Sequence, residues 1–185
     1  MSNLQLAFFG LPETFLNGQA VRFPTKKTLA LLAYLVCESG LHTREKLAGI
    51  FWANHDESGG RTALRKALGF LKTALGESEP AFLLAARETL GFNLDANLRA
   101  DFLDLEFAAK RVRLEQTFDD VFRVHLERIV AVRGEFLTGV TLLDAPDFDS
   151  WLELKRESLQ RDLDLVLQKL ITLQCRVQKD RKSVV

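Results

Sequence analysis

The sequence contains little cysteine, little proline and no long apolar run. Its two cysteines, Cys37 and Cys175, lie far apart and form no CxxC pair, which is typical of free thiols in a reducing cytosol. No apolar run approaches the roughly 20 residues that a membrane-spanning helix needs, so no membrane partner is expected. The N-terminus lacks the basic start and small-residue cleavage site of a secretory signal. We therefore expect a cytoplasmic protein.

The charges balance overall but not locally. The 185 residues include 25 basic and 25 acidic side chains, and 47% are hydrophobic, which excludes a disordered tail and a collagen-like fibre. Such a length suits one large domain or two small ones. Residues 58–76 contain four basic and no acidic side chains, whereas the charges of 77–98 are mostly acidic. This local excess of positive charge is the strongest functional signal in the composition.

The N-terminal pattern predicts a small antiparallel sheet. Apolar and polar residues alternate over 4–8, the period of a half-buried strand. Two further short runs, 14–16 and 19–23, flank Asn17-Gly18. Because both residues tolerate positive φ, this dipeptide between apolar runs predicts a hairpin.

Three helices are expected after the sheet. Helical spacing extends from 25 to 40, from 43 to 52 and from about 58 to 75. Thr25 is the predicted N-cap of the first helix. Asp56 or Ser58 is the predicted cap of the third, and Gly76 is expected to end it.

A second hairpin and a purely helical region complete the pattern. Alternating apolar residues over 82–94 predict a hairpin with a polar tip at Arg87-Glu88. After a short polar joint at 95–100, helices are expected over about 102–114, 118–133 and 147–176. The sequence thus predicts an α+β unit with winged helix-turn-helix topology at 1–98, followed by an all-α, TPR-like unit at 99–185.

The third helix has the composition of a DNA recognition helix. With its leucines turned inward, the outward and flanking positions at 100° per residue are Arg61, Thr62, Arg65, Lys66, Gly69, Lys72 and Thr73. Cations neutralise phosphates, and arginine also bonds guanine in the major groove. The hairpin tip at Arg87 would be a wing that reaches an adjacent minor groove or phosphate. We therefore predict that this helix and Arg87 bind double-stranded DNA.

Catalytic and metal-binding interpretations find no support in the sequence. His42, His55 and His125 are widely spread, with no cysteine or histidine at metal-ligand spacing. The neighbouring residues 55–58 supply the types of a hydrolytic triad but cannot converge as a triad must. No GxGxxG or GxxxxGK[ST] motif occurs. We expect no enzyme activity, no catalytic or metal-ligating residue and no cofactor.

Ordered residue runs over nearly the whole chain match one known family. In the first unit they are LAFFG at 6–10, FPTKK at 23–27, LALLAYL at 29–35, REKLA at 44–48, Trp52, LRKAL at 64–68 and LKTALG at 71–76. In the second unit they are DF at 101–102, LE at 105–106, RGEFLTG at 133–139 and APDFDSWL at 145–152. The chain resembles the bacterial transcriptional activators of the antibiotic-regulatory-protein type. In these proteins a response-regulator-type winged helix precedes a bacterial transcriptional activator domain.

The resemblance implies function as well as fold. It implies binding to promoter DNA with direct repeats, contact with RNA polymerase, and a DNA-facing role for Arg61, Thr62, Arg65, Lys66 and Thr73. The helical unit is expected to supply the polymerase contact or to bind a second copy of the chain. Because the family's activator domain normally continues through further helical hairpins, 99–185 is expected to be an incomplete one, in either a fragment or a shortened member of the family.

A rival interpretation is a protein-interaction module whose winged helix no longer binds DNA. Phe70 on the third helix, the Gly59-Gly60 pair in its first turn and the zero net charge favour this alternative. The basic, acid-free stretch of the helix favours DNA binding instead. The sequence identifies neither the operator nor the direction of regulation.

Overall fold

A computed structural model describes residues 2–76, 82–114, 119–131 and 134–182. Both ends of the helix predicted over 118–133 therefore lie outside the described residues. Part of the segment between the third helix and the second hairpin also lies outside them. In the described ranges the chain combines two small sheets with six helices, and its C-terminal part is helical. The mixed α/β character expected for the N-terminal part is confirmed.

The first sheet joins the start of the chain to the end of the second hairpin. It contains β1 (Leu4–Ala7), β2 (Glu13–Leu16), β3 (Gln19–Ala20) and β7 (Leu98–Ala100), in the order β3-β2-β1-β7. Asn17 and Gly18 both adopt positive φ, at 53° and 78°, in the turn between β2 and β3. The hairpin predicted from this dipeptide is confirmed, although β3 ends well before residue 23.

The segment 95–100 is not the polar joint that the sequence pattern predicted. Its second half is β7, which runs parallel to β1 with Leu4 opposite Leu98 and Leu6 opposite Ala100. The prediction was wrong because a strand this short has no period of its own, and its existence depends on β1, over 90 residues earlier. The boundary expected between 98 and 99 falls inside this strand.

Three helices and a second sheet follow the first hairpin. The helices are α1 (Lys26–Cys37), α2 (Arg44–Phe51) and α3 (Glu57–Leu75). The sheet contains β4 (Leu41–Thr43), β5 (Leu83–Ala85) and β6 (Thr89–Phe92), in the order β4-β6-β5. Thr25 caps α1 as predicted, by accepting from the Thr28 N–H. Strand β4 was not predicted, because three residues give no measurable alternation.

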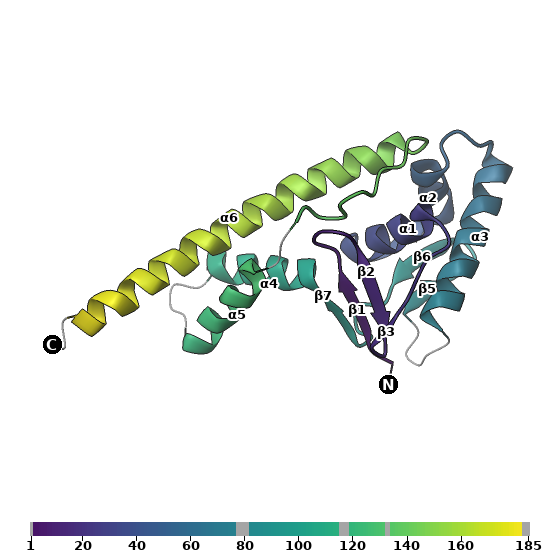
Figure 1. Ribbon diagram of the computed structural model, residues 1–185. Helices are drawn as coiled ribbons and strands as arrows, with labels where there is room; N and C mark the ends of the chain where they lie inside the picture. The colour runs from purple at the N-terminus through teal and green to yellow at the C-terminus, as the bar shows by residue number, and fades with distance from the viewer. Residues whose placement is uncertain (1, 77–81, 115–118, 132–133, 183–185) are drawn as a thin grey trace.

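The C-terminal part is built from α4 (Asp101–Leu114), α5 (Asp120–Val130) and α6 (Pro146–Lys182). Helix α6 begins beside α2 and extends along the molecule past α4 and α5 (Figure 1). Helix α3 lies at the opposite end from the C-terminus of α6. The three predicted helices are confirmed within the described ranges, and α6 continues six residues beyond its predicted end at 176.

The N- and C-terminal parts share one hydrophobic core. Phe8, which follows β1 directly, Phe102 of α4 and Phe136 are each at most 1% exposed. The ring of Phe102 lies 5.8 Å from that of Phe8 and 5.4 Å from that of Phe136. Asp101 adds a polar clamp, since its carboxylate accepts hydrogen bonds from the N–H groups of Phe8, Phe9 and Phe102. These contacts fix α4 against the first sheet.

A second junction connects α6 to α1 and α2. The ring of Trp151 lies 4.9 Å from that of Tyr34, and its Nε1 donates to Glu38 Oε1 at 2.8 Å. The ring of Phe148 lies 5.1 Å from that of Phe51 of α2, tilted by 35°. Aromatic pairs of this kind contribute about 0.5–1.5 kcal/mol each beyond their buried area. The helices that support α3 are therefore packed directly on α6.

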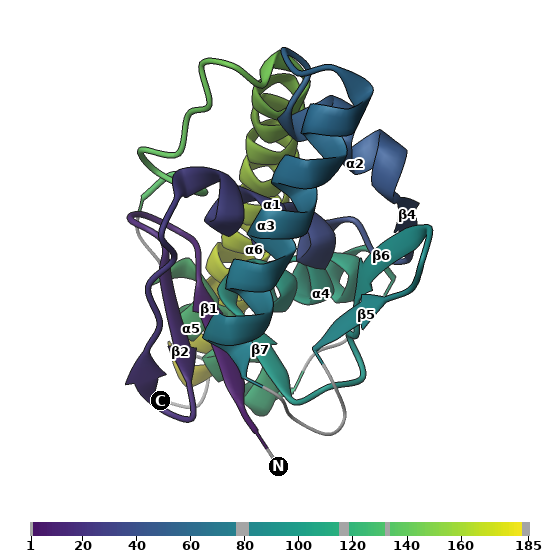
Figure 2. The ribbon, with the colours of Figure 1, turned by 90° about the vertical axis from the view of Figure 1, so that its right-hand side faces the viewer.

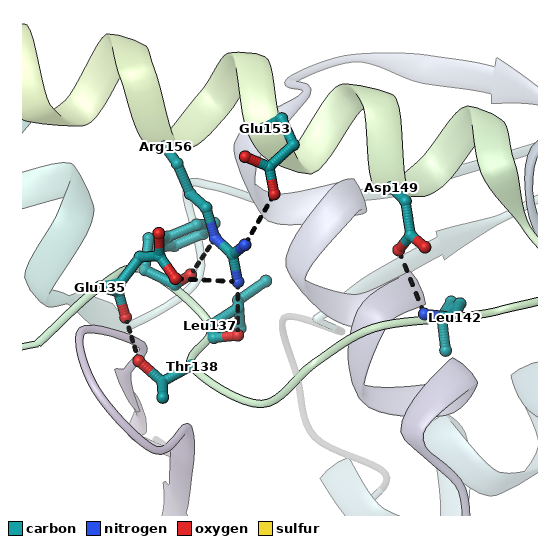
Figure 3. Close-up of polar contacts among 8 residues, drawn as sticks. Glu135, Leu137, Thr138, Leu142, Asp149, Glu153 and Arg156 are labelled. Atoms are coloured by element: carbon teal, nitrogen blue, oxygen red, sulfur yellow. Dashed lines mark hydrogen bonds and ion pairs between the residues drawn. The ribbon is translucent and has the colours of Figure 1, made fainter.

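Arg156 of α6 fixes the segment between α5 and α6 (Figure 3). Its Nε donates to Phe136 O at 2.9 Å and its Nη2 to Leu137 O at 3.1 Å, while Nη1 pairs with Glu153 at 2.8 Å. Further along, the Asp149 carboxylate accepts from the Leu142 N–H at 3.1 Å. A guanidinium suits this role because its planar fork satisfies several carbonyls at once.

Candidate nucleic-acid interface

Helix α3 has a hydrogen-bonded cap at its start and a glycine at its end. Asp56 is the N-cap: its Oδ1 accepts from the Gly59 N–H at 3.0 Å, and the Ser58 hydroxyl donates to Oδ2 at 2.9 Å. These hydrogen bonds, that of Ser58 first, lower the pKa of the Asp56 carboxyl, so the cap is ionised at neutral pH. Gly76 ends the helix at a φ of 69°. Both predicted boundaries are confirmed.

One side of α3 is buried, as predicted. Leu64, Leu68, Leu71 and Leu75 are at most 5% exposed. Near the start of the helix the buried Gly60 faces α2, where an added Cβ would lie 3.5 Å from Ala48 Cβ. At position 59 an added Cβ would lie only 2.6 Å from the Asp56 carboxylate. The cap therefore explains the glycine at position 59, whereas the distance at position 60 is an ordinary van der Waals contact that does not require glycine.

The other side of α3 is exposed (Figure 2). The exposed positions are Arg61, Thr62, Arg65, Lys66, Gly69, Lys72 and Thr73. Phe70 is half-buried, and the ammonium of Lys66 lies 5.9 Å from its ring centroid. The predicted exposure of this face is confirmed, and its contact with DNA stays a prediction.

The polar side chains of this face of α3 differ in the hydrogen bonds and ion pairs that they form. The hydroxyls of Thr62 and Thr73 donate to the carbonyls four residues earlier, at 2.9 and 3.0 Å. Their lone pairs remain able to accept a hydrogen bond. Arg61 pairs with Glu57 at 2.7 Å. Within the part of the chain that the structure describes, Arg65, Lys66 and Lys72 form no ion pair.

The predicted hairpin tip lies beside this helix. Strands β5 and β6 pair in antiparallel register, and Arg87 lies at the tip between them. Its side chain is 95% exposed, with its Nε 3.4 Å from Glu88 Oε1. An ion pair with this exposure contributes little to stability, so it leaves the guanidinium available to another anion.

A cleft of about 520 Å³ lies among α2, α3 and the hairpin tip. Its cationic lining residues are Arg44, Arg61, Arg65, Lys72 and Arg87, and its acidic ones are Glu45 and Glu88. Four of the predicted site residues, from two elements far apart in sequence, therefore meet at one opening. The predicted residues outside its lining are Thr62, Lys66, Gly69 and Thr73, which lie on the exposed face of α3.

Arg44 was missed by the sequence analysis. It is the first residue of α2, and its guanidinium donates from Nε and Nη2 to Ala86 O at 3.2 and 2.9 Å. The only local signal is an arginine next to the capping Thr43. Its link to the hairpin spans 42 positions and becomes visible only in the fold.

The described residues offer neither a metal-binding cluster nor a membrane-spanning helix. In those ranges no group of three or more histidine, cysteine or acidic side chains is arranged to hold a metal ion. Nor does any helix of the described part have the length and apolar character needed to cross a membrane. The charged face of α3 and the hairpin tip remain the candidate site.

Comparison with known proteins supports the fold. Neither the family models nor the curated proteins gave a match. Among solved structures, EmbR of Mycobacterium tuberculosis, in complex with a low-affinity phosphopeptide, superposes with a TM-score of 0.64 at 21% identity. The match covers 90% of this chain and 44% of that one, so the chain spans less than half of the solved structure. The two chains share a fold over nine tenths of this sequence, in agreement with the expected antibiotic-regulatory-protein type of fold.

Proposed function

We propose that the chain is a transcriptional regulator whose first 98 residues form a winged helix-turn-helix that binds double-stranded DNA. The observation that carries the proposal is the cleft in which cations of α3 meet the cations of α2 and the hairpin tip. Helix α3 enters the major groove in this proposal, and Arg87 reaches the neighbouring minor groove or phosphate. The role is one of binding, without catalysis.

The electrostatics of the face support a polyanionic ligand. Three cations of α3, Arg65, Lys66 and Lys72, have no acidic partner in the described ranges. Bringing them to phosphates would therefore break no ion pair between described residues, and each contact would release counterions from the DNA. Phosphate contacts set the position of the helix, and one or two of the arginines read base edges.

The helical part supplies protein contacts in this proposal. The sequence resemblance suggests promoter DNA with direct repeats, RNA polymerase as a partner and activation as the outcome. A second copy of the chain is the alternative partner. Because one α3 presents few cations, paired sites would raise the affinity through avidity.

The direct test is fluorescence anisotropy of labelled random duplex DNA, titrated with the protein at several salt concentrations. We expect a log–log salt slope equivalent to release of about four to six counterions. The matched control is Arg161→Ala, which removes an exposed arginine of α6 that pairs with Glu157 at 3.8 Å. It should leave the slope unchanged, whereas Lys72→Ala should reduce it by about one. A flat salt response, or no binding at low salt, rejects the proposal.

The rival function, a protein-interaction module, rests mainly on Phe70. An anchor residue for a partner is normally an exposed aromatic that becomes buried in the complex. Phe70 is already half-buried, with Lys66 above its ring. This packing favours a role within the α3 surface and supports DNA binding as the main proposal.

A further inference from the structure

Arg44 holds the hairpin tip on both sides of Arg87. Its backbone N–H donates to Glu88 O at 3.0 Å. Its guanidinium donates twice to Ala86 O, at 3.2 and 2.9 Å. Ala86 and Glu88 are the residues immediately before and after Arg87, so a single residue of α2 fixes both of its neighbours.

The position of Arg44 connects the hairpin to the support of α3. Strand β4 pairs with β6, Thr43 opposite Thr89, and then continues directly into α2. Helix α2 in turn contacts α3 where Ala48 faces Gly60. The hairpin tip and α3 therefore both contact α2, and Arg44 is the side chain of α2 that bonds the tip.

Arg87 depends on that connection for its position. Its side chain is 95% exposed, and its neighbour in space is Glu88, whose side chain is 76% exposed. Because the Arg87 side chain has so little packing of its own, its position depends on the backbone of Ala86 and Glu88, to which Arg44 is bonded. A contact that is held in place before binding loses less conformational entropy in the complex.

We propose that Arg44 is a positioning residue that presets the hairpin tip, so that Arg87 meets the DNA backbone while α3 occupies the major groove. The inference rests on the proposed DNA-binding function. It states that the effect of Arg44 on DNA affinity passes through Arg87 and is not simply the addition of another positive charge.

A double-mutant cycle tests this dependence. DNA anisotropy is measured at one salt concentration for the unmodified protein, Arg44→Ala, Arg87→Ala and the double variant. We expect Arg87→Ala to weaken binding at least about threefold in the unmodified protein but less than about twofold in the Arg44→Ala background. If the two single losses multiply in the double variant, Arg44 acts independently and the inference is overturned.

The conservative variant Arg44→Lys separates position from charge. Lysine keeps the positive charge but cannot reproduce the forked contact with Ala86 O. We expect Arg44→Lys to show the same reduced sensitivity to Arg87→Ala as Arg44→Ala does. Full sensitivity to Arg87→Ala in the lysine background would mean that charge alone suffices, and would overturn the inference.

Amide hydrogen exchange tests the same contact without DNA. The protected amides are those of Ala86, bonded to Thr89 O, and of residue 44, bonded to Glu88 O. Both should exchange faster in Arg44→Ala, while the α3 amides and the melting temperature stay unchanged. Unchanged exchange at the tip rejects only the positioning role and leaves the proposed DNA-binding function standing. Absence of DNA binding by the unmodified protein rejects the proposed function, and with it the inference.

Discussion

Helices α3 and α6 both carry several cations, but the environments of these cations differ. In α6, Lys155 bonds Glu106 at 2.6 Å, and Arg156 pairs with Glu153 at 2.8 Å. In α3, Arg65 and Lys72 face the cleft without an ion pair in the described part of the chain. The cations of α6 stabilise the fold, whereas those of α3 keep their charge available to a ligand.

The difference explains how a chain of zero net charge can present a basic face. Lys155 and Arg156 of α6 lie against acidic groups of the same chain. Helix α3 has Asp56 and Glu57 at its start, and Glu45 and Glu88 line the cleft beside it. In the described part of the chain none of these four pairs with Arg65 or Lys72. Net charge is therefore a poor guide to binding here, and the pairing of each cation is a better one.

The largest expected effect is on stability, from Arg156→Ala. The guanidinium is 15% exposed and donates to two backbone carbonyls. Its loss removes the side-chain donor of Phe136 O, whereas Leu137 O keeps the Val140 N–H at 3.0 Å. We expect a loss of about 1.5–3 kcal/mol in the free energy of unfolding, measured by urea denaturation. Under conditions where the variant is fully folded, DNA affinity should stay within about twofold of the unmodified protein.

Arg161→Ala is the matched control on the same helix. Its ion pair with Glu157 is about two-thirds exposed on both sides, so we expect a change below about 0.5 kcal/mol. A stability loss equal to that of Arg156→Ala would contradict the view that hydrogen bonds to the carbonyls, and not the positive charge, make Arg156 structural.

The converse effect is expected from Arg65→Ala. Arg65 is exposed and forms no ion pair in the described ranges, so the free energy of unfolding should change by less than about 0.5 kcal/mol. DNA affinity should fall by about 1–3 kcal/mol on a selected operator if Arg65 reads a base. Anisotropy on the operator and on random duplex separates the roles: an equal loss on both assigns Arg65 to a phosphate. A stability loss without any loss of DNA affinity would mean that Arg65 has a structural role, like Lys155 and Arg156 of α6.

The sequence was sufficient to predict α3 because its signals are local. The leucine spacing, the cap at Asp56 and the stop at Gly76 all lie within 21 residues, and they define both the helix and its exposed face. The helical period of 100° per residue thus identified the exposed positions without knowledge of the fold. Whether those positions contact DNA depends on a ligand, which no periodicity describes.

The features that the sequence did not reveal depend on distant partners. Strand β7 exists because β1 pairs with it, and the role of Arg44 depends on its hydrogen bond to Ala86 O. The shared core of Phe8, Phe102 and Phe136 likewise joins residues from three separate segments. A pattern read along the chain therefore could not reveal the contacts that join its N- and C-terminal parts.

A smaller effect is expected from Phe70→Arg, which adds a cation to the exposed side of α3. Because Phe70 is half-buried beside Lys66, the substitution removes some packing and replaces a cation–π contact with a repulsion. We still expect DNA binding to strengthen by up to about threefold at low salt, through one additional phosphate contact. Anisotropy with random duplex measures the change. Weaker DNA binding together with loss of a protein partner would favour the interaction-module function instead.

The smallest expected effect concerns the acidic start of α3 and its dependence on pH. The hydrogen bonds from Ser58 and Gly59 lower the folded-state pKa of the Asp56 carboxyl below its ordinary value. The stabilisation from the ionised cap is therefore fully present at neutral pH and is lost as pH falls through that lowered pKa. Asp56→Asn keeps a capping oxygen but has no charge to interact with the helix dipole. Its melting temperature should lie slightly below that of the unmodified protein at neutral pH, and the difference should vanish in acid. A difference independent of pH would mean that the charge of Asp56 adds nothing to α3, and that the acidic start of this helix serves only the geometry of its first turn.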